Sequence, residues 1–255
     1  MGKVYSIEYA AACHRGLVRE KNQDNFWCDG VFLECENDGF PDILTGMIDV
    51  SEQPIFAVFD GMGGEAAGEQ AAWLATRAFD DAVPDRHAKE GDAFLTDVFV
   101  LMNDSVCDYA ASHRINRMGA TTVAVLFGEG KAISCNLGDS RIYLCRKYEL
   151  TQLSEDHISS FERSGKGFLE QYLGIRADVF RIEPHFEKLE IIEGDFYLLC
   201  SDGLSDMLSM EEIGARLAEQ QKPAHVVKGL LEDALAAGGS DNITIIACKA
   251  VGENE

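Results

Sequence analysis

The sequence contains no apolar run long enough to cross a membrane, and its first residues lack the apolar segment of a secretory signal. None of its eight cysteines forms a CxxC pair, and most lie in apolar, strand-like runs, where cysteine acts as a small hydrophobic residue. We therefore expect a cytoplasmic protein that makes no membrane contact and keeps its cysteines reduced in the core.

Basic residues are also scarce, because 22 Lys and Arg stand against 44 Asp and Glu, which gives a formal net charge of -22. Such a charge repels a phosphate polyanion and removes the counterion release that drives nucleic-acid binding. The six histidines form no pair with metal-ligand spacing. We therefore expect no nucleic-acid partner, and the acidic residues become the main candidates for chemistry.

The length and the hydrophobic content fit one globular domain. With 255 residues, of which 46% are hydrophobic, the chain can bury a sizeable core, and we expect one domain over residues 1–255 and a monomer. Strand-like patterns dominate residues 3–60 and 120–153 and return at 186–200 and 242–250. Few β-α-β alternations occur, so we predict an α+β fold with two antiparallel sheets and helices outside them.

Helical patterns fill the gaps between these strand blocks in two pairs. The first pair is predicted at residues 65–79, which are rich in alanine, and at residues 92–111. In the second pair, Ser209 and Glu212 form a capping box ahead of one helix, and Pro223 begins the other. Each pair follows a strand that ends in an acidic turn.

Two segments between the predicted elements look irregular. Residues 34–54 are acidic and could form a hairpin or a surface loop. Residues 156–184 combine glycine, serine and arginine and are a candidate mobile flap near the functional site.

Four aspartates stand in short turns at the ends of apolar, strand-like runs. The runs cover residues 55–59, 133–137, 196–200 and 243–248, and the acids beside them are Asp60, Asp139, Asp202 and Asp241. Carboxylates gathered at one sheet edge repel one another, so they stay ionised only where hard cations or basic groups neutralise them. Each acid alone could be an ordinary turn residue. Together they form an oxygen-rich ligand set that suits Mg²⁺ or Mn²⁺ and disfavours zinc.

Three of these acids also constrain the directions of their strands. Asp60 and Asp202 end their strands, whereas Asp241 begins its own. If all three share one rim, the last strand must run antiparallel to the other two.

Arg19 could supply the positive charge that a phosphate group requires. Its guanidinium can grip phosphate oxygens through two hydrogen bonds. An exposed arginine in an ordinary ion pair is the alternative that the sequence leaves open.

Six short motifs follow one another along nearly the whole chain, and their order is more specific than any one of them. They are Arg19-x-x-Asn22-Gln23-Asp24, Asp60-Gly61-Met62-Gly63-Gly64, Met118-Gly119-Ala120-Thr121-Thr122, Gly138-Asp139-Ser140-Arg141, Ser201-Asp202-Gly203-Leu204-Ser205-Asp206 and Asp241-Asn242. This series resembles the PP2C family of metal-dependent protein serine/threonine phosphatases in its bacterial form. The resemblance implies a four-layer α-β-β-α sandwich, in which two antiparallel sheets are flanked by antiparallel helix pairs.

The resemblance also implies a site with two Mn²⁺ or Mg²⁺ ions per chain. By position, Asp60 would bridge the two ions and would be a catalytic residue. Asp202 and Asp241 would complete the coordination of one ion, and the carbonyl of Gly61 would bind the other. Family members hydrolyse the phosphoester by direct attack of a water that bridges the two metals.

Four further residues take their expected roles from the same resemblance. Asp24 would be catalytic by hydrogen-bonding metal-bound water, and Arg19 would be catalytic by holding the substrate phosphate. Asp139 and Asp206 match acids that bind a third, weaker metal in some members.

The sequence departs from the family pattern at three places. Met62 stands where eukaryotic members have a histidine suggested as the general acid. Asn116 and Arg117 precede Met118 where many bacterial members carry an aspartate tied to the third metal. The flap before Asp202 is also shorter than in typical bacterial relatives.

The leading hypothesis is a metal-dependent phosphatase that acts on phosphoserine and phosphothreonine in proteins. Its partners would then be phosphorylated proteins, the targets of a serine/threonine kinase. Two alternatives remain open on the sequence: a non-catalytic scaffold that binds phosphoproteins with the same fold, and a phosphomonoesterase for small molecules.

Overall fold

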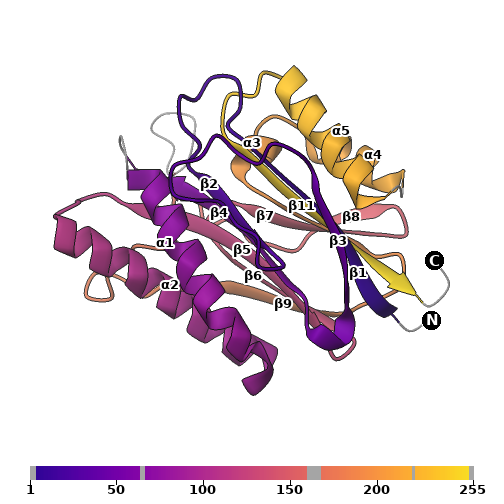
Figure 1. The fold of residues 1–255 in the computed structure, drawn as a ribbon, viewed down its shortest axis with the longest axis horizontal. Coiled ribbons are helices and arrows are strands. Elements are labelled where there is room, and N and C mark those ends of the chain that lie inside the picture. Colours follow the sequence, from indigo (N-terminus) through magenta and orange to yellow (C-terminus); the bar gives the residue numbers. More distant parts are fainter. Residues whose placement is uncertain (1–3, 64–66, 160–167, 220–221, 253–255) are drawn as a thin grey trace.

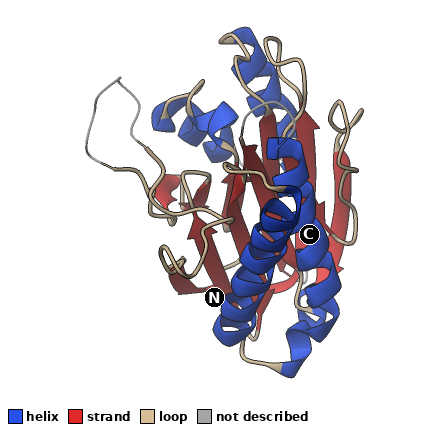
Figure 2. Cartoon of the chain, turned by 90° about the vertical axis from the view of Figure 1, so that its left-hand side faces the viewer, coloured by secondary structure: helices blue, strands red, loops and turns tan. Residues whose placement is uncertain are grey.

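The computed structural model of the protein describes residues 4–63, 67–159, 168–219 and 222–252. Two antiparallel β-sheets form the centre of the molecule, with helices on their outer sides (Figures 1 and 2). In Figure 1, α1 and α2 lie on one side of the strands and α4 and α5 on the other. The predicted α+β class and the sandwich of two sheets and flanking helices are confirmed.

The first sheet has six strands in the order β3-β1-β11-β10-β7-β8. Their bounds are β1 Val4–His14, β3 Leu44–Asp49, β7 Arg141–Arg146, β8 Glu149–Gln152, β10 Phe196–Cys200 and β11 Ile243–Gly252. The central strands β10 and β11 are almost wholly buried, because this sheet is covered on one face by helices and on the other by the second sheet. Their near-continuous apolar sequences follow from burial on both faces.

The second sheet has five strands in the order β2-β4-β5-β6-β9. Their bounds are β2 Asp24–Cys28, β4 Ile55–Met62, β5 Gly119–Gly128, β6 Lys131–Leu137 and β9 His185–Glu190. Strand β11 runs antiparallel to β10, as the positions of Asp202 and Asp241 predicted. Strand β4 belongs to the second sheet, so Asp60 reaches the same rim from across the sandwich rather than from a neighbouring strand.

The outer helices form one group over each sheet, as predicted. Their bounds are α1 Ala67–Ala82, α2 Gly91–His113, α3 Asp202–Ser205, α4 Met210–Ala218 and α5 Pro223–Ala236, with short 3-10 turns η1 Val50–Glu52 and η2 Val83–Ala88. The capping box forms as predicted, because the Ser209 side chain accepts a bond from the Glu212 amide and the Glu212 carboxylate accepts one from the Ser209 amide. The first two residues of the helix predicted at 65–79 lie outside the described residues.

The layer between the two sheets is built around buried aromatic side chains. Phe56 of β4 and Phe127 of β5 have ring centroids 6.1 Å apart, and Phe127 lies 5.0 Å from Tyr197 of β10 in the opposite sheet. All three rings are fully buried. Large rings in edge-to-face contact fix the spacing between layers, so this core also fixes how the strand ends of the two sheets lie relative to each other.

The irregular segments are only partly as expected. Residues 34–43 form a surface connection, but Leu44–Asp49 is the edge strand β3, which pairs with β1 and forms no hairpin with β4. The candidate flap has short bridges between Ile158 and Leu169 and between Ala120 and Leu173, and its residues 160–167 lie outside the described residues.

The helices and the cysteines have the following properties. No helix in the described ranges is both long and apolar enough to cross a membrane. All eight cysteines have free thiols, and six of them are buried. Burial raises the pKa of the Cys200 thiol to about 12, which makes it an inert core group.

Candidate active site

One pocket of about 590 Å³ collects most of the acids predicted from the sequence. Its lining includes Asp60 at the end of β4, Asp139 after β6, Asp202 at the start of α3 just after β10, and Asp241 before β11. Arg19, from the connection between β1 and β2, lines the same pocket. The second sheet supplies Asp60 and Asp139, and the first supplies Asp202 and Asp241, so the pocket lies across the ends of both sheets.

Asp24 lies behind this pocket, where it links the two sheets. It pairs in register with Asp60 on the neighbouring strand, and its side chain is buried. Its carboxylate accepts hydrogen bonds of 2.7 Å from Ser201 Oγ, directly after β10, and from Thr244 Oγ1 of β11, so both donors come from the side of the first sheet. Burial raises the pKa of the Asp24 carboxyl to about 7, although these two bonds favour the ionised form.

Asp60 lies where several negative charges converge. Burial raises the pKa of its carboxyl well above the usual value, and the charges of Asp24, Asp202 and Asp139 raise it further. An acid in this position releases its proton readily only when a positive charge is close by. The electrostatics of the pocket therefore favour a bound cation next to Asp60.

Arg19 is exposed, and its guanidinium turns toward the acids. Its Nη2 donates a 2.5 Å hydrogen bond to Asp241 Oδ2, and this bond is the main cause of the raised pKa of Arg19. Arg19 is therefore ion-paired, as the alternative reading of the sequence allowed, and the pair lies inside the pocket rather than elsewhere on the surface.

Asp206 is not among the residues that line the pocket. It follows α3, and its backbone amide donates a 2.7 Å bond to the carbonyl of Asp202, which holds its exposed side chain one turn further along the chain. The structure therefore brings Asp139 into the pocket and leaves Asp206 outside it.

Asn242 organises the loop that carries Arg19. Its Nδ2 donates 2.9 Å bonds to the carbonyls of Arg15 and Lys21, and its Oδ1 accepts a 2.8 Å bond from the amide of Gln23. One side chain thus fixes both ends of the loop. Its side-chain role, like those of Ser201 and Thr244, was not anticipated from the sequence, although all three lie within or beside the acidic motifs.

Two glycines of the acidic motifs allow backbone segments to approach one another closely. A Cβ on Gly61 would lie 2.1 Å from the carbonyl oxygen of Gly68, and one on Gly203 would lie 1.9 Å from the carbonyl oxygen of Asn242. Gly61 remains within β4 and makes no tight turn. The glycine beside each aspartate is therefore required for close packing of the strand end.

The donor set of the pocket fits a hard divalent cation. Asp60, Asp202, Asp241 and the Gly61 carbonyl offer only oxygen, the ligand type that Mg²⁺ and Mn²⁺ prefer. In the described part of the chain, no group of three or more His, Cys, Asp or Glu side chains is already arranged to hold one ion. Asp241 is instead engaged by Arg19, so this carboxylate would have to exchange partners to serve as a ligand.

The pocket lining also contains apolar side chains. Met62, Leu169 and Tyr172 lie in the lining, as does Phe168, which is 62% exposed. Arg117 is a second arginine among the lining residues. The pocket thus offers positive, negative and apolar surfaces to one ligand.

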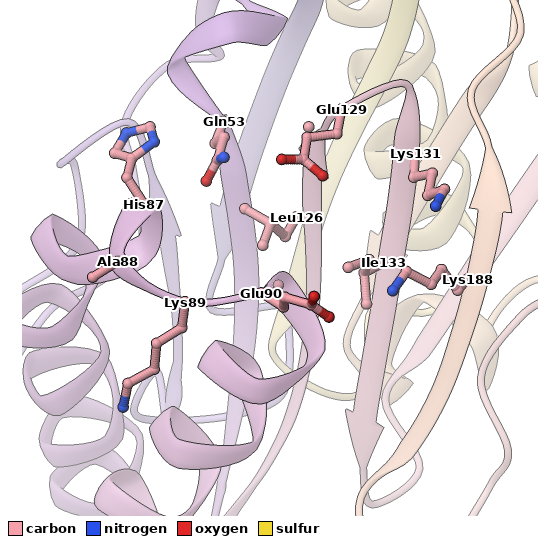
Figure 3. A pocket seen from close by; sticks show the side chains of 12 residues that line it. Gln53, His87, Ala88, Lys89, Glu90, Leu126, Glu129, Lys131, Ile133 and Lys188 are labelled. Carbon is pink, nitrogen blue, oxygen red and sulfur yellow. The ribbon is translucent and has the colours of Figure 1, made fainter.

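A different cavity of about 420 Å³ lies near the opposite ends of β5 and β6 (Figure 3). Lys131 and Lys188 approach it from β6 and β9, Glu90 and Glu129 bring opposite charge, and Leu126 lies in its lining. It contains none of the acids predicted for the site. The chemistry predicted from the sequence therefore belongs to the first pocket.

The fold and this pocket belong to a known family of enzymes. The sequence profile of the family described as Protein phosphatase 2C matches residues 42–237. The chain belongs to this family, so the resemblance inferred from the six motifs is confirmed.

Relatives and solved structures agree with this assignment. The chain is 31% identical to the serine/threonine phosphatase stp of Listeria monocytogenes over 251 residues, which cover 91% of each protein. The crystal structure of the Mycobacterium tuberculosis serine/threonine phosphatase PstP/Ppp is similar with a TM-score of 0.79 and 29% identity, over 96% of this chain and 99% of that one. The catalytic domain of PstP in complex with two manganese ions is similar with a TM-score of 0.76 and 31% identity, over the same shares of the two chains.

Proposed function

We propose that this protein removes phosphate from phosphoserine and phosphothreonine in proteins that a serine/threonine kinase has modified. The observation that carries the proposal is the composition of the pocket. Arg19 lines it together with Asp60, Asp202 and Asp241, and these three acids come from the ends of two different sheets. The relatives named above as serine/threonine phosphatases, and the manganese ions in one of the similar structures, support it.

In this proposal, Asp60, Asp202, Asp241 and the Gly61 carbonyl would hold two Mn²⁺ or Mg²⁺ ions. When bound, such ions lower the pKa of the attacking water and neutralise phosphoryl oxygens. Asp139 adds a further negative charge that acts on Asp60. Asp206 lies outside the lining, so we assign it no part in holding these two ions.

Arg19 has the task of holding the phosphate group. Its guanidinium has a planar fork that matches two phosphate oxygens. Because one Asp241 oxygen cannot bond a cation and Arg19 equally well at the same time, a loaded site would free the guanidinium for the substrate. The Asn242 hydrogen bonds to Arg15 and Lys21, here called the Asn242 clamp, keep Arg19 within reach of the pocket whether or not it is paired with Asp241.

Asp24 has the task of orienting the attacking water. Its carboxylate cannot turn freely, because Ser201 and Thr244 hold one of its oxygens from the opposite sheet. Asp24 pairs in register with Asp60, so a water molecule beside Asp60 would lie within reach of the other Asp24 oxygen. Asp24 thereby fixes the direction of approach to phosphorus, which an in-line displacement requires.

The decisive experiment measures phosphate release from phosphothreonine peptides and from small phosphomonoesters, with and without Mn²⁺. We expect release from the peptides only with the metal, and loss of nearly all turnover in Asp60→Asn. Binding of phosphopeptides without any release would favour a non-catalytic scaffold. Much faster release from small esters than from every peptide would favour a small-molecule phosphatase.

A further inference from the structure

A groove of about 280 Å³ lies beside α2, outside the candidate active site. Its opposite wall is the chain segment that leads into β9, which passes next to α2 in Figure 1. Ile175 and Ile182 are nearly buried in this wall, whereas Val100 of α2 and Phe180 are 45% and 52% exposed. Two large apolar side chains are thus open to solvent at one hollow.

The edge of this groove carries charge on both sides. Asp104 and Arg181 belong to the lining, and neither forms an ion pair with another residue in the described ranges of the chain. An apolar centre with a polar rim is the usual composition of a site that binds part of another protein. A peptide that carries both an apolar side chain and charged neighbours fits this surface.

A rigid wall connects the groove with the active-site pocket. Tyr172 lines the pocket and Ile175 lines the groove, so the two linings are joined by a stretch of chain whose end Cα atoms are at most about 11 Å apart. Leu173 exchanges two backbone hydrogen bonds with Ala120, of 3.0 and 2.8 Å. The two hollows therefore have a fixed spacing.

Asn103 holds the other side of this wall. Its buried side chain accepts a 2.9 Å bond from the Gly174 amide and donates a 3.1 Å bond to the Ile175 carbonyl. The same segment is thus bound to α2 through Asn103 and to β5 through Leu173.

From these contacts we propose that the groove binds an apolar side chain of the phosphoprotein substrate, a few residues away from the phosphorylated one. This inference rests on the proposed function, because the substrate must already occupy the pocket. An extended peptide advances about 3.3 Å per residue, so an apolar residue roughly three to six positions from the phosphoresidue reaches the groove. The occupant is thus a segment of the substrate itself.

The test compares phosphothreonine peptides that carry Leu or Ser at single positions within six residues on either side. We expect leucine at one or two neighbouring positions to raise kcat/KM about tenfold, chiefly through KM, which is the usual effect of filling one apolar pocket. Val100→Asp should abolish this preference and leave nitrophenyl phosphate hydrolysis unchanged. Leu101→Asp is the matched control, because Leu101 is the next residue of α2, is 47% exposed and does not line the groove.

A second pair of variants covers the other wall. Phe180→Ser should also abolish the leucine preference, whereas Val179→Ser should not, because Val179 is 76% exposed and lies outside the lining. The melting temperatures of all four variants show whether each one is folded, so a change in preference can be assigned to the groove.

The possible results separate the groove proposal from the proposed function. Peptide hydrolysis with no positional preference, or a preference that survives Val100→Asp and Phe180→Ser, overturns the groove and leaves the proposed function intact. If the wild type hydrolyses neither peptides nor nitrophenyl phosphate, the proposed function fails and the groove proposal fails with it. A dimer in light scattering that Val100→Asp dissociates would assign the groove to a second copy of the chain and would also overturn the proposal.

Discussion

Gly203→Ala tests whether close backbone packing sets the geometry of the acidic pocket. The new Cβ would lie 1.9 Å from the carbonyl oxygen of Asn242, whereas real contacts are not shorter than 3.0 Å. The difference of 1.1 Å must be taken up by moving α3 away from residues 241–242, which carry Asp241 and the clamp on the Arg19 loop. A displacement of about 1 Å at reacting groups can lower turnover by about 100-fold.

We therefore expect Gly203→Ala to lose roughly 100-fold in kcat/KM for a phosphopeptide and to bind Mn²⁺ more weakly in calorimetry. The overpacking should also destabilise the fold by about 1–3 kcal/mol in urea denaturation. Gly214→Ala is the control, because a Cβ there meets only the Leu150 side chain at 3.6 Å. It should stabilise α4 by about 0.5–1 kcal/mol without changing activity. Wild-type turnover and Mn²⁺ affinity in Gly203→Ala would refute the reasoning.

Three further predictions concern charge in the pocket. Mn²⁺ at 100 times its Kd should add about 2.7 kcal/mol of stability and raise Tm by about 5–10 °C, whereas a Tm that ignores both metal and chelator would contradict the proposed cation site. Arg19→Lys keeps the charge but loses the planar fork, so KM for a phosphopeptide should rise while calorimetric Mn²⁺ affinity stays close to that of the wild type; unchanged kinetics would remove Arg19 from phosphate binding. Asp206→Asn should reduce turnover much less than Asp60→Asn, because Asp206 lies outside the lining, and equal losses in steady-state assays would show that this ranking is wrong.

Much of the fold could be predicted because its signals are local. The apolar run that ends at Asp60 and the run that begins after Asp241 are buried strands, and burial on both faces leaves little choice of residue there. The capping box at Ser209 likewise depends on residues three positions apart. By contrast, β3 is a half-exposed edge strand within an acidic segment, so its weak alternation gave no clear prediction.

The contacts that hold the candidate site together could not be predicted in the same way. Asp24 is held by Ser201 and Thr244, which are 177 and 220 positions away in the sequence. Serine and threonine at strand ends have no sequence signal that distinguishes a long-range hydrogen bond from a turn. The Arg19 pairing with Asp241 also depends on how the two sheets stack, which no local pattern encodes.

The origin of the pocket in two sheets has a consequence for the lifetime of the folded protein. Asp60 comes from one sheet and Asp202 and Asp241 from the other, so their arrangement exists only after the sheets have docked. A cation that binds only the docked arrangement would slow unfolding and leave the refolding rate nearly unchanged if the sheets dock after the transition state of folding. Removal of the metal would then shorten the time the chain remains folded, and cellular metal supply would govern how long each molecule survives proteolysis.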